Sequence, residues 1–526
     1  MKKIVFFLLS CLLRTGCSQT DKNSSATNRN SQVSQIVTPS VTPSTEEIHS
    51  NSRSNNKSSV NQNTNKPNSV TVFSVNDIHG SLEKYNDPDY GNKELGIARL
   101  SYAIKHDPDY DPNTSIILSS GDSWQGGYLA HEERTLTDKL LGERGVVSRA
   151  IGNHEFDFGL KTREELSKAA PYPYLGLNIV DSKGEIPSFL KKSAIIEKGG
   201  VRYGIRGVID SGIESTIKAG NRGQYTFSDS RNLISAEADY LLSQGCDLVL
   251  LSAHADYKSR YVQIIGNTFD SSKISGIFGG HSHRFQNEIV GKLPYVQGSS
   301  NSRGYSKRTF SLSTKKATSR RYVEAKNSYN VADSLLEKDI LDELDDANKK
   351  HPTHNLATFS DTFSKGGELN RFVPQVRINR AKKQNLGEEK TKRKLVGIHN
   401  LGGIRSSIPK GTRTEKELFK FSPFDNLVLV SKSVKGSEIR NSIGSDTAYG
   451  VTANYCYYVE GKSSISSNDL YDVITIDFVA TGSYWRGTEP FINLNQDGSE
   501  LVIRDRYKNY FRSLGDNPII SSADYD

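Results

Sequence analysis

The chain has 526 residues, a formal net charge of +8 and 35% hydrophobic residues. This length is more than one hydrophobic core serves, so we expect at least two domains. The 68 basic residues are spread along the chain, and no nucleic-acid motif or basic-aromatic stripe accompanies them. The composition therefore predicts a soluble enzyme-sized protein with a mixed-charge surface and no DNA or RNA partner.

The N-terminus predicts export. Lys2 and Lys3 precede an apolar run over residues 4–13, which is too short to span a bilayer, so residues 1–17 are expected to be a signal peptide. The run ends in Leu-Arg-Thr-Gly-Cys17, which resembles a bacterial lipoprotein cleavage site with a lipid on Cys17. Arg14 departs from the small or aliphatic residue usual three places before that cysteine, so release of a free protein stays an alternative.

Residues 18–68 are rich in Ser, Asn, Thr and Gln and contain no aromatic residue. Such a segment buries too little apolar area to fold, so it is expected to be a disordered tether with a reach of roughly 40 Å. Three cysteines remain after the signal: Cys17, Cys246 and Cys456. Cys246 begins a predicted core strand and Cys456 lies in a distant domain, so no structural disulfide is expected.

Between residues 69 and 332, five short apolar runs are bounded by glycine and polar turns, which is typical of buried strands. Helical patterns such as Leu233–Gln244 alternate with them, so we predict an α/β domain. The five runs are Val70–Val75, Ser115–Leu118, Gly145–Ile151, Asp247–Leu251 and Ile274–Phe278.

An amphipathic helix over Asp333–Lys350 is predicted at the domain junction, which we place at residues 333–355. Ser334 and Glu337 have the spacing of a capping box. Apolar residues then repeat every fourth position: Leu336, Ile340 and Leu344.

Residues 356–526 mix helical segments with β-rich stretches such as Leu427–Ser431 and Tyr471–Ala480. A second, α+β domain is therefore expected there.

Each of the five apolar runs leads directly into residue types that bind metals. Ligands in an open α/β sheet gather beyond the carboxyl ends of the strands, so these side chains are expected to meet in one site. Asp122 stands alone after its strand and is the natural bridge between two ions. The full set is Asp77, His79, Asp122, Asn153, His254, His281 and His283.

Two divalent ions about 3.5–4 Å apart would activate water and neutralise phosphoryl charge, which is the chemistry of phosphate ester hydrolysis. The mixed nitrogen and oxygen donors suit zinc, manganese or cobalt and do not choose among them.

These motifs resemble the metallophosphoesterase family in order and spacing, and Gly152–Gly159 (GNHEFDFG) has the form typical of bacterial 5′-nucleotidases. The resemblance implies a β-sandwich flanked by helices. It also implies two ligand sets that share Asp122: one with Asp77, His79 and His283, the other with Asn153, His254 and His281. His154, oriented by Asp157, would stabilise the transition state or protonate the leaving group. We interpret Glu155 as structural.

The C-terminal half resembles the nucleotide-binding domain of 5′-nucleotidases through Asn400–Arg405, Ile408–Gly411 and Pro423–Asn426. The resemblance implies that Arg405 contacts phosphate, that Phe424 and Phe478 stack on the base, and that Asn426 binds the base edge. The alternative is that both phenylalanines are core residues.

Two departures from that pattern concern the substrate. Tyr484 stands where the family has a ribose-binding acid, so we expect weak discrimination between ribose and deoxyribose. The segment around Glu368 only loosely matches the usual helix start, and it offers Arg371 and Arg377 as candidate phosphate contacts.

The sequence thus predicts a monomeric, two-metal enzyme that hydrolyses nucleoside 5′-monophosphates at the cell surface or in the periplasm, lipid-anchored through Cys17. Two enzymatic alternatives use the same scaffold: a 2′,3′-cyclic-nucleotide phosphodiesterase and a UDP-sugar hydrolase. A third alternative is a nucleotide-binding surface lipoprotein without catalysis.

Overall fold

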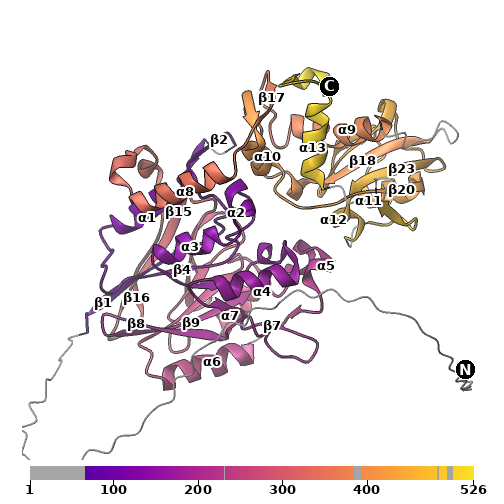
Figure 1. Cartoon of the computed structure of the whole chain (residues 1–526). Coiled ribbons are helices and arrows are strands. Elements are labelled where there is room, and N and C mark those ends of the chain that lie inside the picture. The colour runs from indigo at the N-terminus through magenta and orange to yellow at the C-terminus, as the bar shows by residue number, and fades with distance from the viewer. Residues whose placement is uncertain are drawn as a thin grey trace, which may run out of the picture. The chain divides into compact units, whose positions relative to one another are not determined.

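The structure is a computed structural model that describes residues 66–89, 91–229, 231–383, 393–482, 485–493 and 502–525 (Figure 1). The predictions for the signal peptide, Cys17, the tether up to residue 65 and Tyr484 lie outside these ranges. None of the helices within them has both the length and the apolar composition that crossing a bilayer requires.

Residues 69–324 form two six-stranded sheets. The first contains, in spatial order, β16 (Ala317–Glu324), β15 (Gly304–Ser311), β1 (Ser69–Val75), β4 (Ile116–Ser119), β5 (Val146–Ala150) and β6 (Tyr174–Leu175). The second contains β13 (Phe285–Val290), β14 (Leu293–Gly298), β12 (Gly276–Gly279), β11 (Leu248–His254), β9 (Val201–Ile209) and β8 (Ser193–Lys198). The five predicted strands are confirmed as β1, β4, β5, β11 and β12, with shifts of a few residues at their ends.

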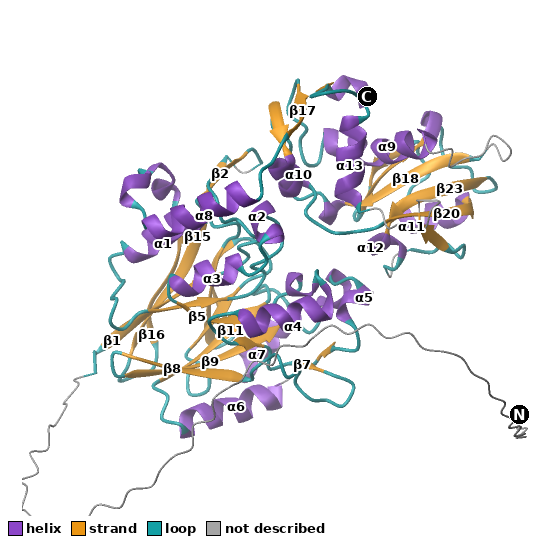
Figure 2. Ribbon diagram, in the orientation of Figure 1, coloured by secondary structure: helices purple, strands orange, loops and turns teal. Residues whose placement is uncertain are grey.

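The two sheets pack face to face, because successive strand residues point to opposite faces. Val70 and Val72 of β1 belong to the same buried cluster as Leu248 and Leu250 of β11, which fills the space between the sheets. Phe73 and its neighbours on the other face of β1 pack in a separate cluster that includes helix residues. The predicted sandwich flanked by helices is confirmed, and Figure 2 shows α6 and α8 on opposite sides of the strands.

Both sheets have a parallel centre; the second sheet is antiparallel at both edges, and the first only on the side of β15 and β16. β1, β4, β5 and β6 run parallel, as do β9, β11, β12 and β14. The parallel strands therefore end at one edge of each sheet, where loops can carry a site. The helices are α1 (Gly96–Lys105), α2 (Tyr128–Glu132), α3 (Leu136–Glu143), α4 (Gly159–Ala169), α5 (Ala219–Arg222), α6 (Arg231–Ser243) and α7 (Arg260–Thr268), and the minor strands are β2 (Tyr85–Asp87), β3 (Asn92–Glu94), β7 (Ile179–Val180) and β10 (Thr226–Phe227).

The junction helix α8 spans Lys338–Lys350, and the predicted capping box at its start is wrong. Ser334 lies in a separate 3₁₀ turn, and Glu337 is the N-cap residue without a side-chain cap bond. The Glu337 carboxylate instead accepts hydrogen bonds from Ser101 at 2.6 Å and from Lys105. Contact with α1 thus replaces the local cap, while the predicted apolar face of α8 is buried at Ile340 and Leu344.

Residues 355–525 form a mixed α and β region with its own buried cluster, which runs from Leu356 to Tyr525. The buried cluster of the preceding half that reaches farthest along the chain ends at Ala347. The main sheet contains β21 (Tyr449–Val451), β22 (Tyr455–Val459), β18 (Lys394–Asn400), β23 (Leu470–Ile476), β20 (Val428–Lys435) and β24 (Phe491–Asn493). A smaller sheet contains β19 (Gly411–Thr414), β17 (Asn355–Phe359) and β25 (Ile519–Ile520), and the helices are α9 (Glu368–Lys383), α10 (Glu415–Phe421), α11 (Gly436–Ile443), α12 (Asp477–Ala480) and α13 (Ile503–Arg512).

Two further details of the prediction are settled. The stretch Tyr471–Ala480 is not one strand: β23 ends at Ile476, and Asp477–Ala480 forms the short helix α12. Cys246 and Cys456 are both buried and both free, so they form no disulfide with each other, as predicted.

Candidate active site

The seven predicted ligand residues all lie at or just beyond the carboxyl ends of parallel strands. Two follow β1, one follows β4, one follows β5, His254 is the last residue of β11, and two follow β12: in chain order Asp77, His79, Asp122, Asn153, His254, His281 and His283. The parallel strands bring these segments to one edge, so residues more than 200 positions apart become neighbours.

Five of these ligand residues have a left-handed backbone conformation: Asp77 (φ 48°), His79 (50°), Asp122 (54°), His281 (78°) and His283 (59°). Non-glycine residues rarely adopt positive φ, and each instance costs about 1–3 kcal/mol unless the surroundings enforce it. Sharp turns of this kind let a short loop aim its side chain back across the strand ends.

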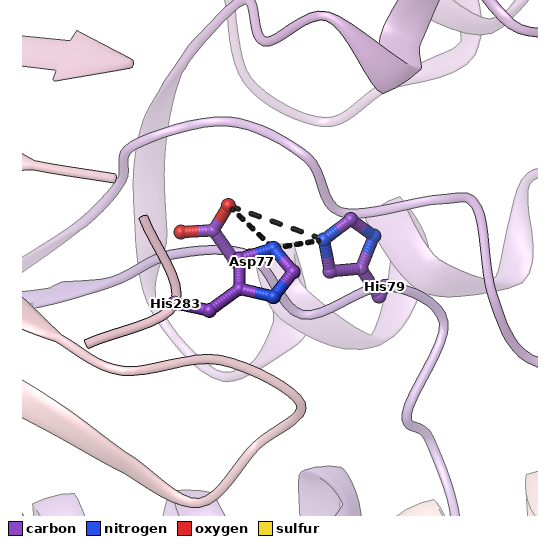
Figure 3. A group of neighbouring side chains, drawn as sticks. All are labelled: Asp77, His79 and His283. Atoms are coloured by element: carbon purple, nitrogen blue, oxygen red, sulfur yellow. Dashed lines mark hydrogen bonds and ion pairs between the residues drawn. The ribbon is translucent and has the colours of Figure 1, made fainter. Parts of the chain in front are cut away.

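The first cluster contains Asp77, His79 and His283, whose ligand atoms converge (Figure 3). The Nε2 atoms of the two histidines lie 2.9 Å apart, and Asp77 Oδ1 lies 3.6 Å from His283 Nε2 and 4.0 Å from His79 Nε2. Asp122 adjoins this cluster, since its Oδ2 is 4.0 Å from His79 Nε2.

The second cluster is built around the same Asp122 carboxylate. His254 Nε2 lies 3.1 Å from Asp122 Oδ2 and 3.1 Å from Asn153 Oδ1, and His281 Nδ1 also lies 3.1 Å from that amide oxygen. Asp122, His254 and His281 form a second group with the spacing of a metal site. Asp122 is therefore shared between the two clusters.

The tautomers of two histidines fit cation binding. His79 Nδ1 lies 2.9 Å from the carbonyl oxygen of Gln125, and His254 Nδ1 lies 2.8 Å from that of Ser120. A carbonyl only accepts, so each Nδ1 carries a proton, and each Nε2 is left to offer its lone pair to a cation when the ring is neutral. Lone pairs and carboxylates that converge in this way suit divalent cations.

Electrostatics keep three imidazoles neutral, which metal ligation requires. Burial lowers the pKa of His79 well below its usual value, and the positive charge of Arg405 lowers it further. Burial and the neighbouring His79 do the same to His283. The pKa of His281 falls to about 4, first through burial and then through His254.

The pKa values of the Asp77 and Asp122 carboxylates shift in opposite directions. Burial raises the pKa of Asp77 to about 7, because the attraction of His254 offsets only part of the desolvation. Burial also opposes ionisation of Asp122, but His254 and His154 hold its pKa well below the usual range. Asp122 in turn raises the pKa of His254 to about 10 against the effect of burial. In the absence of a cation, a proton on His254 balances Asp122, and a cation would replace that proton.

His154 and Asp157 form the predicted pair. His154 Nδ1 lies 2.7 Å from Asp157 Oδ2, and the backbone N–H of His154 donates to Asp122 Oδ1 at 2.8 Å. Asp157 is itself positioned by Asn221, whose amide donates to its carbonyl oxygen at 2.7 Å. A ring nitrogen of His154, one of His79 and an oxygen of Asp122 lie within 4.8 Å of one another, so His154 faces the ligand clusters.

A cleft of about 970 Å³ opens beside these residues and is lined by both halves of residues 66–525. The ring of Phe424 lies 5.6 Å from that of His154, and the Arg405 guanidinium lies 5.7 Å from the Phe424 ring centroid. All four predicted base and phosphate contacts line the cleft: Arg405, Phe424, Asn426 and Phe478.

The remaining substrate predictions have a different outcome. Arg371 is not among the residues that line the cleft. Arg377 is fully buried and donates to the Ile398 carbonyl and to His399, so its prediction as a phosphate contact is wrong. The Asp477 carboxylate beside Phe478 accepts from the Phe478 N–H and pairs with Lys218.

A profile of the 5′-nucleotidase C-terminal domain matches residues 357–453, the segment that supplies Arg405 and Phe424. Residues 357–453 thus carry the 5′-nucleotidase C-terminal domain, and the chain is similar to 5′-nucleotidases. Its curated relatives include the 5′-nucleotidase of Diplobatis ommata, which is 24% identical over 45% of this chain and 43% of the relative. The 2′,3′-cyclic-nucleotide 2′-phosphodiesterase/3′-nucleotidase of Salmonella typhimurium is 24% identical over 41% of this chain and 36% of that protein.

The chain thus spans less than half the length of these two relatives. Among solved structures, the 5′-nucleotidase precursor of Thermus thermophilus superposes with a TM-score of 0.69 at 17% identity, covering 86% of this chain and 99% of that one. This likeness establishes that the chain has the 5′-nucleotidase fold across nearly all of its described residues.

Several cleft residues were not predicted from the sequence. Arg134 follows α2, and Lys218 and Asn221 lie in or beside α5, yet all three line the cleft. None of them follows one of the predicted strands, so the pattern of strand ends gave no signal for them. The spacing of apolar residues in a helix shows which face is buried, but it does not show which polar residues will lie beside a domain distant in the sequence.

Glu155 of the family-like motif acts through backbone contacts, as predicted. It is fully buried, and its carboxylate accepts hydrogen bonds from the N–H groups of Gly152 (2.7 Å), Asp122 (2.9 Å) and Ser123 (2.8 Å). Gly152 also leaves no room for a side chain, because a Cβ there would lie 2.2 Å from Asp122 Oδ1. Together these contacts set the position of the shared carboxylate.

The variant Glu155→Gln should weaken metal binding by about 10–100-fold, as expected for a group that orients a ligand from behind. One amide oxygen replaces two carboxylate oxygens, and the NH₂ group faces backbone donors. Chelator-competition titration measures the loss. Glu165→Gln, on the exposed face of α4, is the matched control, and equal metal affinity in both variants would contradict the assigned role.

Proposed function

We propose that the chain hydrolyses nucleoside 5′-monophosphates to nucleoside and inorganic phosphate with two bound divalent ions. The observation that carries the proposal is the position of Asp122, whose Oδ2 lies 4.0 Å from His79 Nε2 in one cluster and 3.1 Å from His254 Nε2 in the other. Two ions that share this carboxylate would activate a water and neutralise phosphoryl charge when bound. Asp77 and His283 would complete one shell, and Asn153 and His281 the other.

The residues of the chain perform the remaining tasks. Arg405 lines the cleft and would pair with a phosphoryl group, because its planar fork donates two parallel hydrogen bonds. Phe424 and Phe478 line the cleft and would hold the base between their rings, with Asn426 at its edge. His154 would give a proton to the leaving 5′-oxygen as an imidazolium. Burial opposes that charge, but the Asp157 carboxylate at Nδ1 raises the pKa of His154 and so favours the protonated ring.

A second candidate is cleavage of 2′,3′-cyclic nucleotides, which the similarity to the Salmonella enzyme favours. A substrate panel separates the functions: AMP, dAMP, 2′,3′-cyclic AMP and UDP-glucose, assayed with zinc, manganese and cobalt in turn. We expect AMP and dAMP to be hydrolysed fastest, with specificity constants within about tenfold of each other, or about 1.4 kcal/mol. Faster hydrolysis of 2′,3′-cyclic AMP than of AMP would support the second function instead. No turnover with any metal would favour a binding protein.

Replacing Phe424 with alanine tests the stacking role. Loss of one base-aromatic contact costs about 1–3 kcal/mol, so KM for AMP should rise by about fivefold to 150-fold. The matched control is Tyr449→Ala, an aromatic residue that is 48% exposed and lies outside the cleft lining. A KM equal to that of the wild type would contradict the stacking role and support the alternative that Phe424 is a core residue.

The proposal includes export and attachment through Cys17, with the enzyme acting as a monomer. The N-terminal charge and apolar run support export, and one relative is named as a cell wall protein of Listeria monocytogenes. Globomycin treatment of expressing cells tests the anchor, since accumulation of the uncleaved precursor would support lipidation at Cys17.

A further inference from the structure

A second cavity, of about 80 Å³, lies beside the first ligand cluster. His79 and His283 form part of its wall, and it shares His283 and Arg405 with the large cleft. A single water needs about 10–15 Å³ of such space, so the cavity has room for several waters or one small polyatomic ion. It is too small for a nucleoside.

The wall of this cavity is positively charged. It contains four cations and two carboxylates, Asp87 and Glu94. Arg303 pairs with both carboxylates, and Lys420 pairs with Glu94. The other two cations are Arg405 and the solvent-exposed Lys365. With neutral histidines the wall thus carries two more positive than negative charges, which favours an anion.

Gln125 adds a hydrogen-bonding group that no described protein atom satisfies. This residue is 2% exposed and lines the cavity, and its backbone oxygen accepts from His79 Nδ1. Neither its side-chain oxygen nor its side-chain nitrogen has a hydrogen-bond partner among the described residues. Buried amides are almost always paired, so an unpaired amide in the wall favours a polar occupant of the cavity.

We propose that this cavity is a separate binding site for a tetrahedral oxyanion of the size of inorganic phosphate. The Gln125 amide N–H groups and the Lys365 ammonium would donate to it, and Arg405 would link it to the cleft. Phosphate could reach the site from solution or as the product of the proposed reaction, and only the second source rests on the proposed function.

Equilibrium dialysis of the full chain with radiolabelled phosphate tests the site. We expect two phosphates per chain in the metal-loaded protein and one after chelator treatment, because the cavity is built from protein groups alone. Gln125→Glu keeps the shape and replaces the donor with a negative charge, so it should weaken the chelator-resistant binding by at least about tenfold. Lys365→Ala should weaken it in a salt-dependent manner, and Lys432→Ala, an exposed lysine elsewhere, should leave it unchanged.

Two results would overturn the proposal: no phosphate bound after chelation, or equal binding by the wild type and Gln125→Glu. Either would mean that the cavity holds only water. Thermal melting checks that Gln125→Glu is folded, and the exposed Lys365→Ala variant tests the site independently if it is not. A chain that binds this phosphate but fails to hydrolyse AMP would refute the proposed function alone.

Release kinetics distinguish the two sources. If product phosphate stops in the cavity, adenosine should leave the metal-loaded wild type before phosphate does, and the two should leave together in Gln125→Glu. Simultaneous release in both proteins would overturn the product route and make phosphate from solution the ligand.

Discussion

Replacing Asp122 with asparagine is expected to lower the turnover of AMP by about a thousandfold or more, since metal-ion stabilisation of the transition state is worth several kcal/mol. The amide keeps an oxygen for the N–H of His154, which now donates to Oδ1 at 2.8 Å, so the fold should persist. The substitution removes the negative charge of the carboxylate that the two ligand clusters share. Bound metal per chain, measured by mass spectrometry, should fall together with activity.

Asp229→Asn provides the control, because Asp229 is exposed and pairs with the nearby Arg231. Circular dichroism should show the same fold for both variants. Near-normal turnover of Asp122→Asn with metals present would mean that this carboxylate does not bridge the ions.

The variant His154→Ala is expected to lose about 10²–10⁴-fold in turnover of AMP, the usual contribution of a positioned proton donor. The loss should be much smaller with p-nitrophenyl phosphate, whose leaving group departs without a proton. Comparing the two substrates therefore separates proton donation from stabilisation of phosphoryl charge. Both roles are open for a histidine that lies beside Asp122 and His79.

Equal losses on the two substrates would assign His154 to charge stabilisation instead. His354→Ala, at an exposed histidine outside the cleft, should leave both rates unchanged. Asp157→Asn should reproduce the substrate dependence of His154→Ala at smaller amplitude, because it disturbs the orientation of the ring and leaves the ring in place.

The sequence predicted which side chains converge at the strand ends, because the signal for them is local. Each ligand follows a short apolar run, and the strand order brings the ends of β1, β4, β5, β11 and β12 to the site. The identity of the shared residue followed from the isolated position of Asp122. What the sequence could not show was the left-handed backbone at five ligands, since φ depends on the turns that surrounding contacts impose.

Predictions failed where a non-local contact decided the outcome. The Glu337 carboxylate accepts hydrogen bonds from Ser101 and Lys105 of α1 and therefore does not cap the start of its own helix. Arg377 is buried in the C-terminal core, where it donates hydrogen bonds to the Ile398 carbonyl and to His399. The end of β23 was missed because Phe478 and Val479 continue an apolar pattern that fits a strand and a short helix equally.

The left-handed ligand turns also bear on which ion the site uses. Backbone turns set the direction of these five ligands, so the folded loops constrain where each donor atom lies. A shell constrained in this way would offer the same donors to any of the related divalent ions. Selection among zinc, manganese and cobalt then depends on donor chemistry and on the supply of each metal around the protein, and a change of habitat could change the working metal without any change in sequence.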